Sequence, residues 1–187
     1  MIANKLVLVS CCAPCSCGAI KELLAMKDAG FIGEFVVMFY NPNVFPESEH
    51  KKRLDHQIAF CEKVGAQWIT EDWHHDAWLN AIKGLEDEPE CGARCLECFK
   101  FRFEYAVEWA KKMGYDAVAS VLGVSEHKSQ TQVDAAAMLA IHDIGDGKVK
   151  YVPVGWDKDL HKKTLAEQNF YRQKYCGCEF SMRKNKI

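Results

Sequence analysis

The chain has 187 residues, of which 49% are hydrophobic, so we expect a single domain with its own core over residues 1–187. A core of that size needs no disulfide bonds to stabilise it, so the chain is not a small secreted protein held together by disulfides. Its ten cysteines therefore need another explanation. The formal net charge is −2, so a nucleic-acid partner would have to be held by a local basic patch.

The N-terminal sequence MIANKLVLVSCCAP contains an apolar run that is too short for a secretory signal, and no stretch reaches the length of a membrane span. We therefore expect a cytoplasmic protein without a membrane partner. In that reducing compartment, clustered cysteines indicate metal binding or catalysis rather than disulfides.

Strand-like and helix-like patterns alternate along the chain. The predicted elements, in chain order, are a strand at 6–9, a helix at 19–29, a strand at 34–40, a helix at 48–64, a strand at 66–72, helices at 77–84 and 99–112, a strand at 115–123, a helix at 131–142, a strand at 148–155 and a helix at 162–172. This alternation predicts a single-domain, doubly wound α/β fold, Rossmann-like or HUP-like. Its mostly parallel five-stranded sheet would carry helices on both faces.

Four cysteines directly follow the first predicted strand: Cys11, Cys12, Cys15 and Cys17. In open parallel sheets, ligands bind beyond the carboxyl ends of the strands, where the strand order reverses. The loop after the first strand contains neither G-x-x-x-x-G-K-[ST] nor G-x-G-x-x-G. Thiols therefore occupy the position where nucleotide-binding enzymes carry phosphate-binding glycines.

Two further groups of cysteines come later in the chain. Cys91, Cys95 and Cys98 precede the helix predicted at 99–112, and Cys95 and Cys98 are spaced to share one turn. Cys176 and Cys178 flank a glycine, which permits a backbone turn that lets both thiols face one centre. The three separated groups together indicate a metal site far more strongly than one C-x-x-C motif would.

Cys61 is the solitary cysteine. It shares the apolar face of a predicted helix with Ile58 and Val64, where a buried free thiol is common. We therefore expect Cys61 to belong to the core.

Three kinds of chemistry could explain the grouped thiols. A structural zinc ion takes four ligands and leaves several cysteines without a role. A thioredoxin-like enzyme needs one exposed pair. Iron–sulfur ligation, with further thiolates nearby, uses the largest number. The residues alone leave all three alternatives open.

Five motifs resemble the QueH-type epoxyqueuosine reductases. They are SCCAPCS, FYNPNVFPESEHKKR, GLEDEPECGARCLECF, SVLGVSEHKSQ and YRQKYCGCEFS, and they extend in order from Ser10 to Ser181. The resemblance implies a cobalamin-independent oxidoreductase that reduces the epoxide of epoxyqueuosine at the wobble position of tRNA, which completes queuosine. It also implies a [4Fe–4S] cluster beside a single iron ion, and an electron donor that the sequence does not identify.

The resemblance also implies a set of site residues. The cysteines that match the family motifs are Cys11, Cys12, Cys15, Cys95, Cys98, Cys176 and Cys178, whereas Cys17 and Cys91 depart from the pattern. For the ligands of the single iron we favour Cys15 with Cys176 and Cys178.

Glu126 and His127 follow the fourth predicted strand and are the expected catalytic residues. The residues expected to bind substrate or tRNA are Asn41, Asn43, Arg53, Glu88, Arg94, Lys128 and Arg172. Each of these could instead form a loop cap or a surface ion pair.

Two other functions remain as alternatives. One is a zinc-binding RNA adaptor that uses the same thiols structurally and has no redox activity. The other is a nucleotide-activating thiotransferase on a similar sheet, which the absence of phosphate-binding glycines disfavours.

Overall fold

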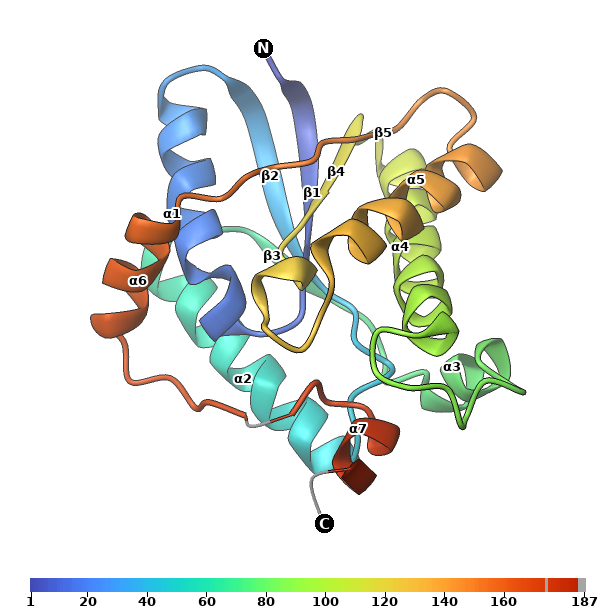
Figure 1. The fold of residues 1–187 in the computed structure, drawn as a ribbon. Coiled ribbons are helices and arrows are strands. Elements are labelled where there is room, and N and C mark those ends of the chain that lie inside the picture. Colours follow the sequence, from blue (N-terminus) through green and yellow to red (C-terminus); the bar gives the residue numbers. More distant parts are fainter. Residues whose placement is uncertain (174, 185–187) are drawn as a thin grey trace.

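The computed structural model describes residues 1–173 and 175–184. The strands within these residues are β1 (Ala3–Ser10), β2 (Ile32–Phe39), β3 (Trp68–Thr70), β4 (Ala117–Ser120) and β5 (Lys150–Tyr151). The helices are α1 (Ala13–Asp28), α2 (Glu47–Val64), α3 (His75–Ala81), α4 (Ala93–Met113), α5 (Gln130–Ile144), α6 (Lys158–Ala166) and α7 (Glu179–Lys184), with a 3₁₀ turn η1 (Leu122–Val124). Figure 1 shows their arrangement.

The five strands form one parallel sheet in the order β3-β2-β1-β4-β5. The chain moves outward from β1 to one edge and then returns to build the other, so the strand order reverses between β1 and β4. This topology confirms the predicted α/β fold class. It also places the loop after β1 at the switch point, where such folds bind their ligands.

Helices cover both faces of the sheet, and β1 shows why. Its side chains alternate between the two faces. Val7 and Val9 pack in a core cluster with residues of α4 and α5, whereas Leu6 and Leu8 pack in a second cluster with residues of α1 and α2. A strand that is buried on both faces must be apolar throughout, as the run in β1 is.

Helix α1 begins at Ala13, six residues before the predicted start. Pro14 occupies its first turn, where the missing N–H costs no hydrogen bond. Gly18 lies in the next turn, where a Cβ would be only 2.6 Å from the Cα of His161 on α6. The glycine therefore permits the close approach of α6 to α1.

Helix α4 also begins early, at Ala93, which places Cys95 and Cys98 on its first two turns. Helix α6 ends at Ala166, so the predicted continuation to 172 is wrong. The chain instead leaves α6 in an extended segment that Figure 1 shows passing across α2 to α7. This segment carries Cys176 and Cys178 to the carboxyl end of the sheet.

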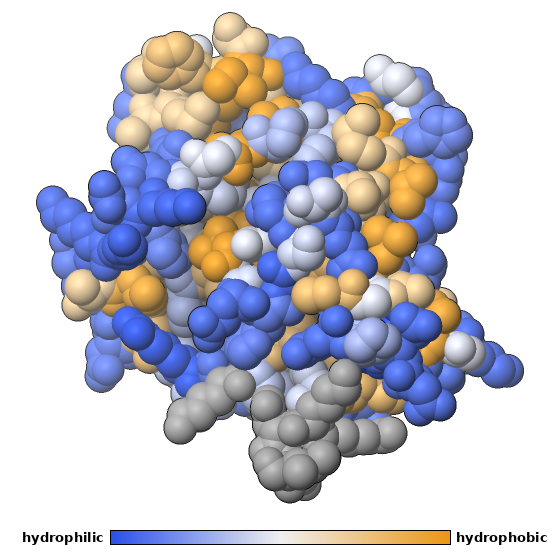
Figure 2. Space-filling view, viewed as in Figure 1, coloured by the Kyte–Doolittle hydropathy of each residue, from blue (hydrophilic) through white to orange (hydrophobic). Residues whose placement is uncertain are grey.

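The edge strands are shorter than predicted. Strand β5 has two residues and is followed closely by Pro153, which has no N–H to donate to a neighbouring strand. In the described part of the chain, no helix is long and apolar enough to cross a membrane. The surface seen in Figure 2 is largely hydrophilic, with apolar residues in separate patches.

Candidate metal centre

Cys11, Cys12 and Cys15 form the first group of thiols, which we call the triad. Their ligand atoms all lie within 4.8 Å of one another, and the Sγ atoms of Cys11 and Cys12 are 3.9 Å apart. Cys12 is the extended N-cap residue of α1, and Cys15 lies one turn further along the helix. Because a helix N-terminus carries partial positive charge, this position favours thiolates.

The three sulfurs are too close together to ionise independently. Hydrogen bonds from Cys12 and then Cys15 hold the pKa of Cys11 well below its usual value. The contact with Cys11 raises the pKa of Cys12 to about 12, and contacts with Cys11 and Cys12 raise the pKa of Cys15. One thiolate is thus stabilised by two thiols, and full ionisation of all three would require a cation among them.

Cys95, Cys98, Cys176 and Cys178 form the second group, which we call the quartet. The first two come from α4 and the last two from the C-terminal segment, and all four line one narrow cavity. Their sulfurs are more widely spaced than those of the triad. Among the described residues, the triad is the one group of three or more ligand atoms that all lie within 4.8 Å of one another. Four thiols that are spread more widely than those of the triad suit a group that contains several metal ions.

The wall of this cavity contains a polar donor without a partner in the described structure. Arg94 is 2% exposed and its Nη2 atom has no hydrogen-bond acceptor, while its Nη1 atom donates to the carbonyls of Glu86 and Glu88. A buried guanidinium N–H requires an acceptor. The sulfide atoms of a cluster held by the quartet would supply one, so the donor set and its surroundings fit an iron–sulfur group.

The C-terminal half of the quartet is held by contacts with the loop before α2. The Tyr175 hydroxyl donates to the carbonyl of Phe45, and the Phe45 N–H donates to the carbonyl of Gly177, both at 2.9 Å. Gly177 has φ +124°, and a Cβ there would lie 2.6 Å from Nη1 of Arg53. Only glycine fits this turn without strain, which explains the C-G-C motif.

Arg53 holds this segment and does not reach the surface. It is 1% exposed; its Nε atom donates to Glu49 at 2.7 Å, and its Nη1 atom donates to the carbonyl of Cys176 at 3.2 Å. The Tyr171 hydroxyl donates to the same Glu49 carboxylate. The predicted role of Arg53 in binding tRNA phosphate is therefore not supported, because a guanidinium buried among these partners cannot reach one.

Lys128 is close enough to both groups of cysteines to interact with their charges. Although burial lowers the pKa of Lys128, the Cys11, Cys176 and Cys15 sulfurs together raise it well above the usual value. These sulfurs come from both the triad and the quartet, so the two groups share one ammonium. The sequence-based prediction assigned Lys128 to phosphate, whereas its position shows that it also faces the metal ligands.

Arg102 is a second cation near the sulfurs, and it was not predicted from the sequence. It is 1% exposed, and its guanidinium donates to the carbonyl of Tyr40 and to Oδ1 of Asn41. Asn41 in turn donates to the carbonyl of Ser10 at 2.9 Å. Both Arg102 and Asn41 thus brace the end of β1. An arginine on the buried face of a predicted helix was the available signal, since such a charge must have a specific partner.

The other predicted residues take several positions. Asn43 is 3% exposed and lines the quartet cavity. Glu88 accepts from the N–H of Ala93 and so caps α4. Glu126 is exposed and His127 half-buried in the loop before α5. Arg172 is exposed on the C-terminal segment.

The three remaining cysteines lie outside both groups. Cys17 is fully buried in the core cluster on the α1 face, and burial raises its pKa to about 11. Cys61 is also fully buried, packs in the same cluster and accepts a hydrogen bond from Gln57, as expected of a core thiol. Cys91 is exposed, with its Sγ atom 3.9 Å from the carbonyl of His127.

A family model described as "Epoxyqueuosine reductase QueH" matches residues 6–184. The chain belongs to the epoxyqueuosine reductase QueH family. Relatives of that name include one from Haemophilus influenzae, 39% identical over 184 residues that make up 96% of this chain and 72% of the relative. Another, from Acinetobacter baylyi, is 37% identical over 185 residues, which are 97% and 82% of the two chains.

Membership of the QueH family confirms the resemblance seen in the motifs. The name describes an oxidoreductase, as expected, and none of these relatives is named as a zinc-binding adaptor. The triad supports the expectation of a metal or iron–sulfur site in this QueH family chain.

Two solved structures share the fold. The U34-tRNA thiolase NcsA from Methanococcus maripaludis with its [4Fe-4S] cluster superposes with a TM-score of 0.53 at 14% identity, covering 98% of this chain and 64% of that one. A predicted subunit of tRNA methyltransferase from Methanocaldococcus jannaschii gives a TM-score of 0.55 at 11% identity, covering 88% and 74%. At these identities the likeness shows the fold alone.

Proposed function

We propose that this protein is a cytoplasmic epoxyqueuosine reductase that acts on tRNA carrying epoxyqueuosine at the wobble position. The reaction removes the epoxide oxygen and leaves an alkene, so it consumes two electrons and two protons and releases water. One observation carries the proposal: seven motif cysteines gather in two groups near the carboxyl end of β1, and one lysine interacts with sulfurs of both groups. An external electron donor must supply the electrons.

The two groups differ in the metal that they suit. The quartet offers the four thiolates that a [4Fe–4S] cluster takes. The triad offers three, which leaves a coordination position open on a single iron, as in catalytic metal sites. When bound, such a cluster supplies electrons singly and such an iron supplies a Lewis acid. This assignment differs from the sequence-based preference for Cys15 with Cys176 and Cys178, because Cys15 lies with the triad and the other two line the quartet cavity.

Side chains around the groups have separate tasks. Lys128 balances the negative charge of the sulfurs and places a positive charge where the oxygen leaves. His127 is the proposed proton donor, since its half-buried loop adjoins Lys128, and Glu126 would orient it. Arg172 is exposed and can reach a phosphate of the tRNA.

The test is anaerobic reconstitution followed by iron, acid-labile sulfide and zinc analysis of the same sample. The reconstituted protein is then incubated with a chemical reductant and tRNA that carries epoxyqueuosine. The tRNA is digested, and the masses of its nucleosides are measured by mass spectrometry. We expect loss of one oxygen atom from the modified nucleoside and iron in excess of sulfide, with a mild chelator removing both the excess iron and the activity. Colourless protein with stoichiometric zinc and unchanged nucleoside would support the adaptor instead.

A further inference from the structure

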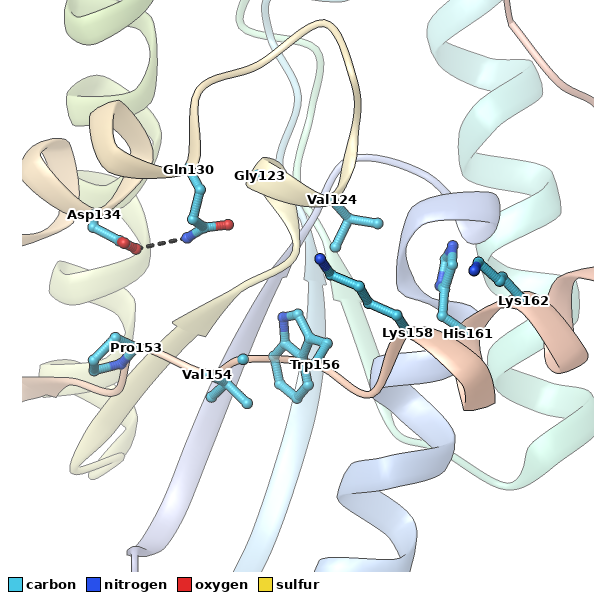
Figure 3. A pocket seen from close by; sticks show the side chains of 11 residues that line it. Gly123, Val124, Gln130, Asp134, Pro153, Val154, Trp156, Lys158, His161 and Lys162 are labelled. Atoms are coloured by element: carbon cyan, nitrogen blue, oxygen red, sulfur yellow. Dashed lines mark hydrogen bonds between the residues drawn. The ribbon is translucent and has the colours of Figure 1, made fainter.

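A second cavity, apart from the cysteines, lies between η1, the β5–α6 connection and α6. Its volume is about 620 Å³, and Figure 3 shows the side chains that line it. The apolar part consists of Val124, Pro153, Val154 and Trp156, and the polar part of Gln130, Asp134, Lys158, His161 and Lys162. A space of this size accommodates a nucleotide-sized ligand, and none of the cysteines lines it.

Both walls of this cavity are connected to the metal centre. One wall is the start of α5, where Gln130 follows Lys128 by two residues, so their Cα atoms lie at most about 7 Å apart. The other wall is α6, which touches α1 at Gly18, one turn beyond Cys15. The cavity is therefore linked to the triad through His161 and Gly18, and to Lys128 through Gln130.

The lining combines the groups that recognise a nucleotide. Trp156 offers an aromatic face, and its Nε1 atom is anchored by donating to the carbonyl of Ser120 at 2.8 Å. The Gln130 amide donates to Oδ1 of Asp134 at 2.7 Å. Figure 3 marks this bond, which holds the amide as a fixed polar edge beside the cavity. Lys158 and Lys162 are exposed, lie one helical turn apart on α6, and form no ion pair with a described residue.

These features match the way proteins bind single-stranded RNA. Unpaired bases are turned out of a loop, stacked on aromatic side chains and read along their edges, while lysines hold the phosphates. A free nucleotide cofactor fits less well, because its phosphates are usually cradled by a glycine-rich loop or by backbone N–H groups at a helix start. Here Asp157 caps the first N–H groups of α6, at Asp159 and Leu160, and places a carboxylate there.

We propose that this cavity binds one nucleotide of the tRNA anticodon loop adjacent to the reacting nucleotide. The base packs against Trp156 and is read by the Gln130 amide, and its phosphate lies at Lys158 and Lys162. The inference rests on the proposed function, since it takes tRNA as the substrate. It adds a second recognition site, which fixes the register of the loop so that the modified nucleotide meets the triad.

The first test uses the reconstituted protein and a labelled anticodon stem-loop RNA, with affinity measured by fluorescence anisotropy at several salt concentrations. The variant is Lys158→Ala/Lys162→Ala. Its control is Lys27→Ala/Lys112→Ala, which makes the same charge change at exposed positions near the C-terminal ends of α1 and α4. We expect at least about a fivefold loss of affinity and a salt slope smaller by about 0.7, because that is the contribution of one phosphate of a single strand that is no longer neutralised. Equal effects in variant and control would overturn the proposal.

The second test isolates the stacked base. Trp156→Leu removes the aromatic ring, whereas Trp156→Phe keeps one, and both lose the indole hydrogen bond to Ser120. Stem-loops with one abasic position are compared with the intact RNA. We expect the affinity of the wild type to fall about tenfold when the abasic position is the one next to the modified nucleotide that fills the cavity. The same abasic position should not lower the affinity of Trp156→Leu any further. Trp156→Phe should behave like the wild type.

Two other outcomes would contradict the proposal in different ways. If the affinity losses caused by Trp156→Leu and by an abasic position add independently at every position, no single base occupies the cavity. Tight binding of adenosine monophosphate or flavin mononucleotide that excess RNA does not displace would assign the cavity to a free cofactor. If the wild type reduces the tRNA but the variants bind RNA normally, only the cavity inference fails. If the wild type neither binds nor reduces the tRNA, the proposed function fails.

Discussion

The triad and the quartet use the same side chain in two different structural settings. The triad comes from five consecutive residues that run from the end of β1 into the first turn of α1, so a single strand-to-helix turn brings its sulfurs together. The quartet joins the start of α4 to a segment near the C-terminus, and its geometry depends on the contacts of Arg53, Tyr175 and Phe45. The triad should therefore persist as long as the sheet is folded, whereas the quartet can be lost by releasing one segment.

The largest expected effect separates the metals of the two groups. Cys98→Ala should remove the quartet's cluster, with most of the iron and nearly all of the acid-labile sulfide, because a methyl group cannot replace a thiolate. Cys12→Ala should remove the excess iron and leave the sulfide unchanged. Iron and sulfide analysis after anaerobic reconstitution distinguishes the two variants. Loss of sulfide in Cys12→Ala, with sulfide retained in Cys98→Ala, would reverse the assignment.

The same difference explains what could be predicted from the sequence. Apolar periodicity and alternation were enough for the parallel sheet and for the switch point after β1, because burial on both faces leaves a clear pattern. The first turns of α1 and α4 were missed because they are built largely from Pro14, cysteines and Arg94, which form no apolar stripe. Since those turns carry Cys15, Cys95 and Cys98, the local geometry of the site emerged only in the structure.

The roles of the cations could not be predicted for another reason. Arg53 lies in a motif rich in charge, and composition alone cannot tell a buried arginine from one that faces a phosphate. Its burial follows from the path of the chain after α6, which brings the carbonyl of Cys176 to its guanidinium across 123 positions of sequence. Contacts of that range are decided by tertiary packing, and no local pattern predicts them.

The next effect in size tests whether Arg53 holds the quartet in place. Arg53→Met should lower the free energy of unfolding by about 3 kcal/mol, because it leaves the Glu49 carboxylate buried without its cationic partner. The exposed pair of Lys51 and Asp55 provides a control, and Lys51→Met should cost less than about 1 kcal/mol. Urea unfolding of the metal-free proteins measures both. If Arg53→Met instead leaves the stability unchanged and makes RNA binding much less dependent on salt, Arg53 contacts phosphate as the sequence predicted.

Gly177→Ala should have a smaller effect, confined to the quartet. The substitution forces an alanine to φ +124° and brings its Cβ against Arg53, at a cost of about 2 kcal/mol. Gly84→Ala is the matched control, because Gly84 also has a positive φ, of +87°, and a Cβ there meets no atom within 4 Å. We expect the sulfide content of Gly177→Ala to fall while the excess iron stays, as measured by the same metal analysis. Equal loss of both would mean that the two groups do not assemble independently.

The smallest effect concerns Cys61, a thiol that neither group uses. Cys61→Ala should leave iron, sulfide and reductase activity unchanged, since Cys61 lies on α2 and packs in the core, not at the carboxyl end of β1. It should lower the free energy of unfolding by about 1 kcal/mol, because packing and the hydrogen bond from Gln57 are lost. The amide oxygen of Gln57 also accepts hydrogen bonds from Ser10 and Ser16, which lie beside the triad. Urea unfolding and iron analysis of one preparation give both quantities. A loss of iron comparable with that of Cys98→Ala would show that the core thiol reaches the metal centre, and that the two groups are not the whole set of ligands.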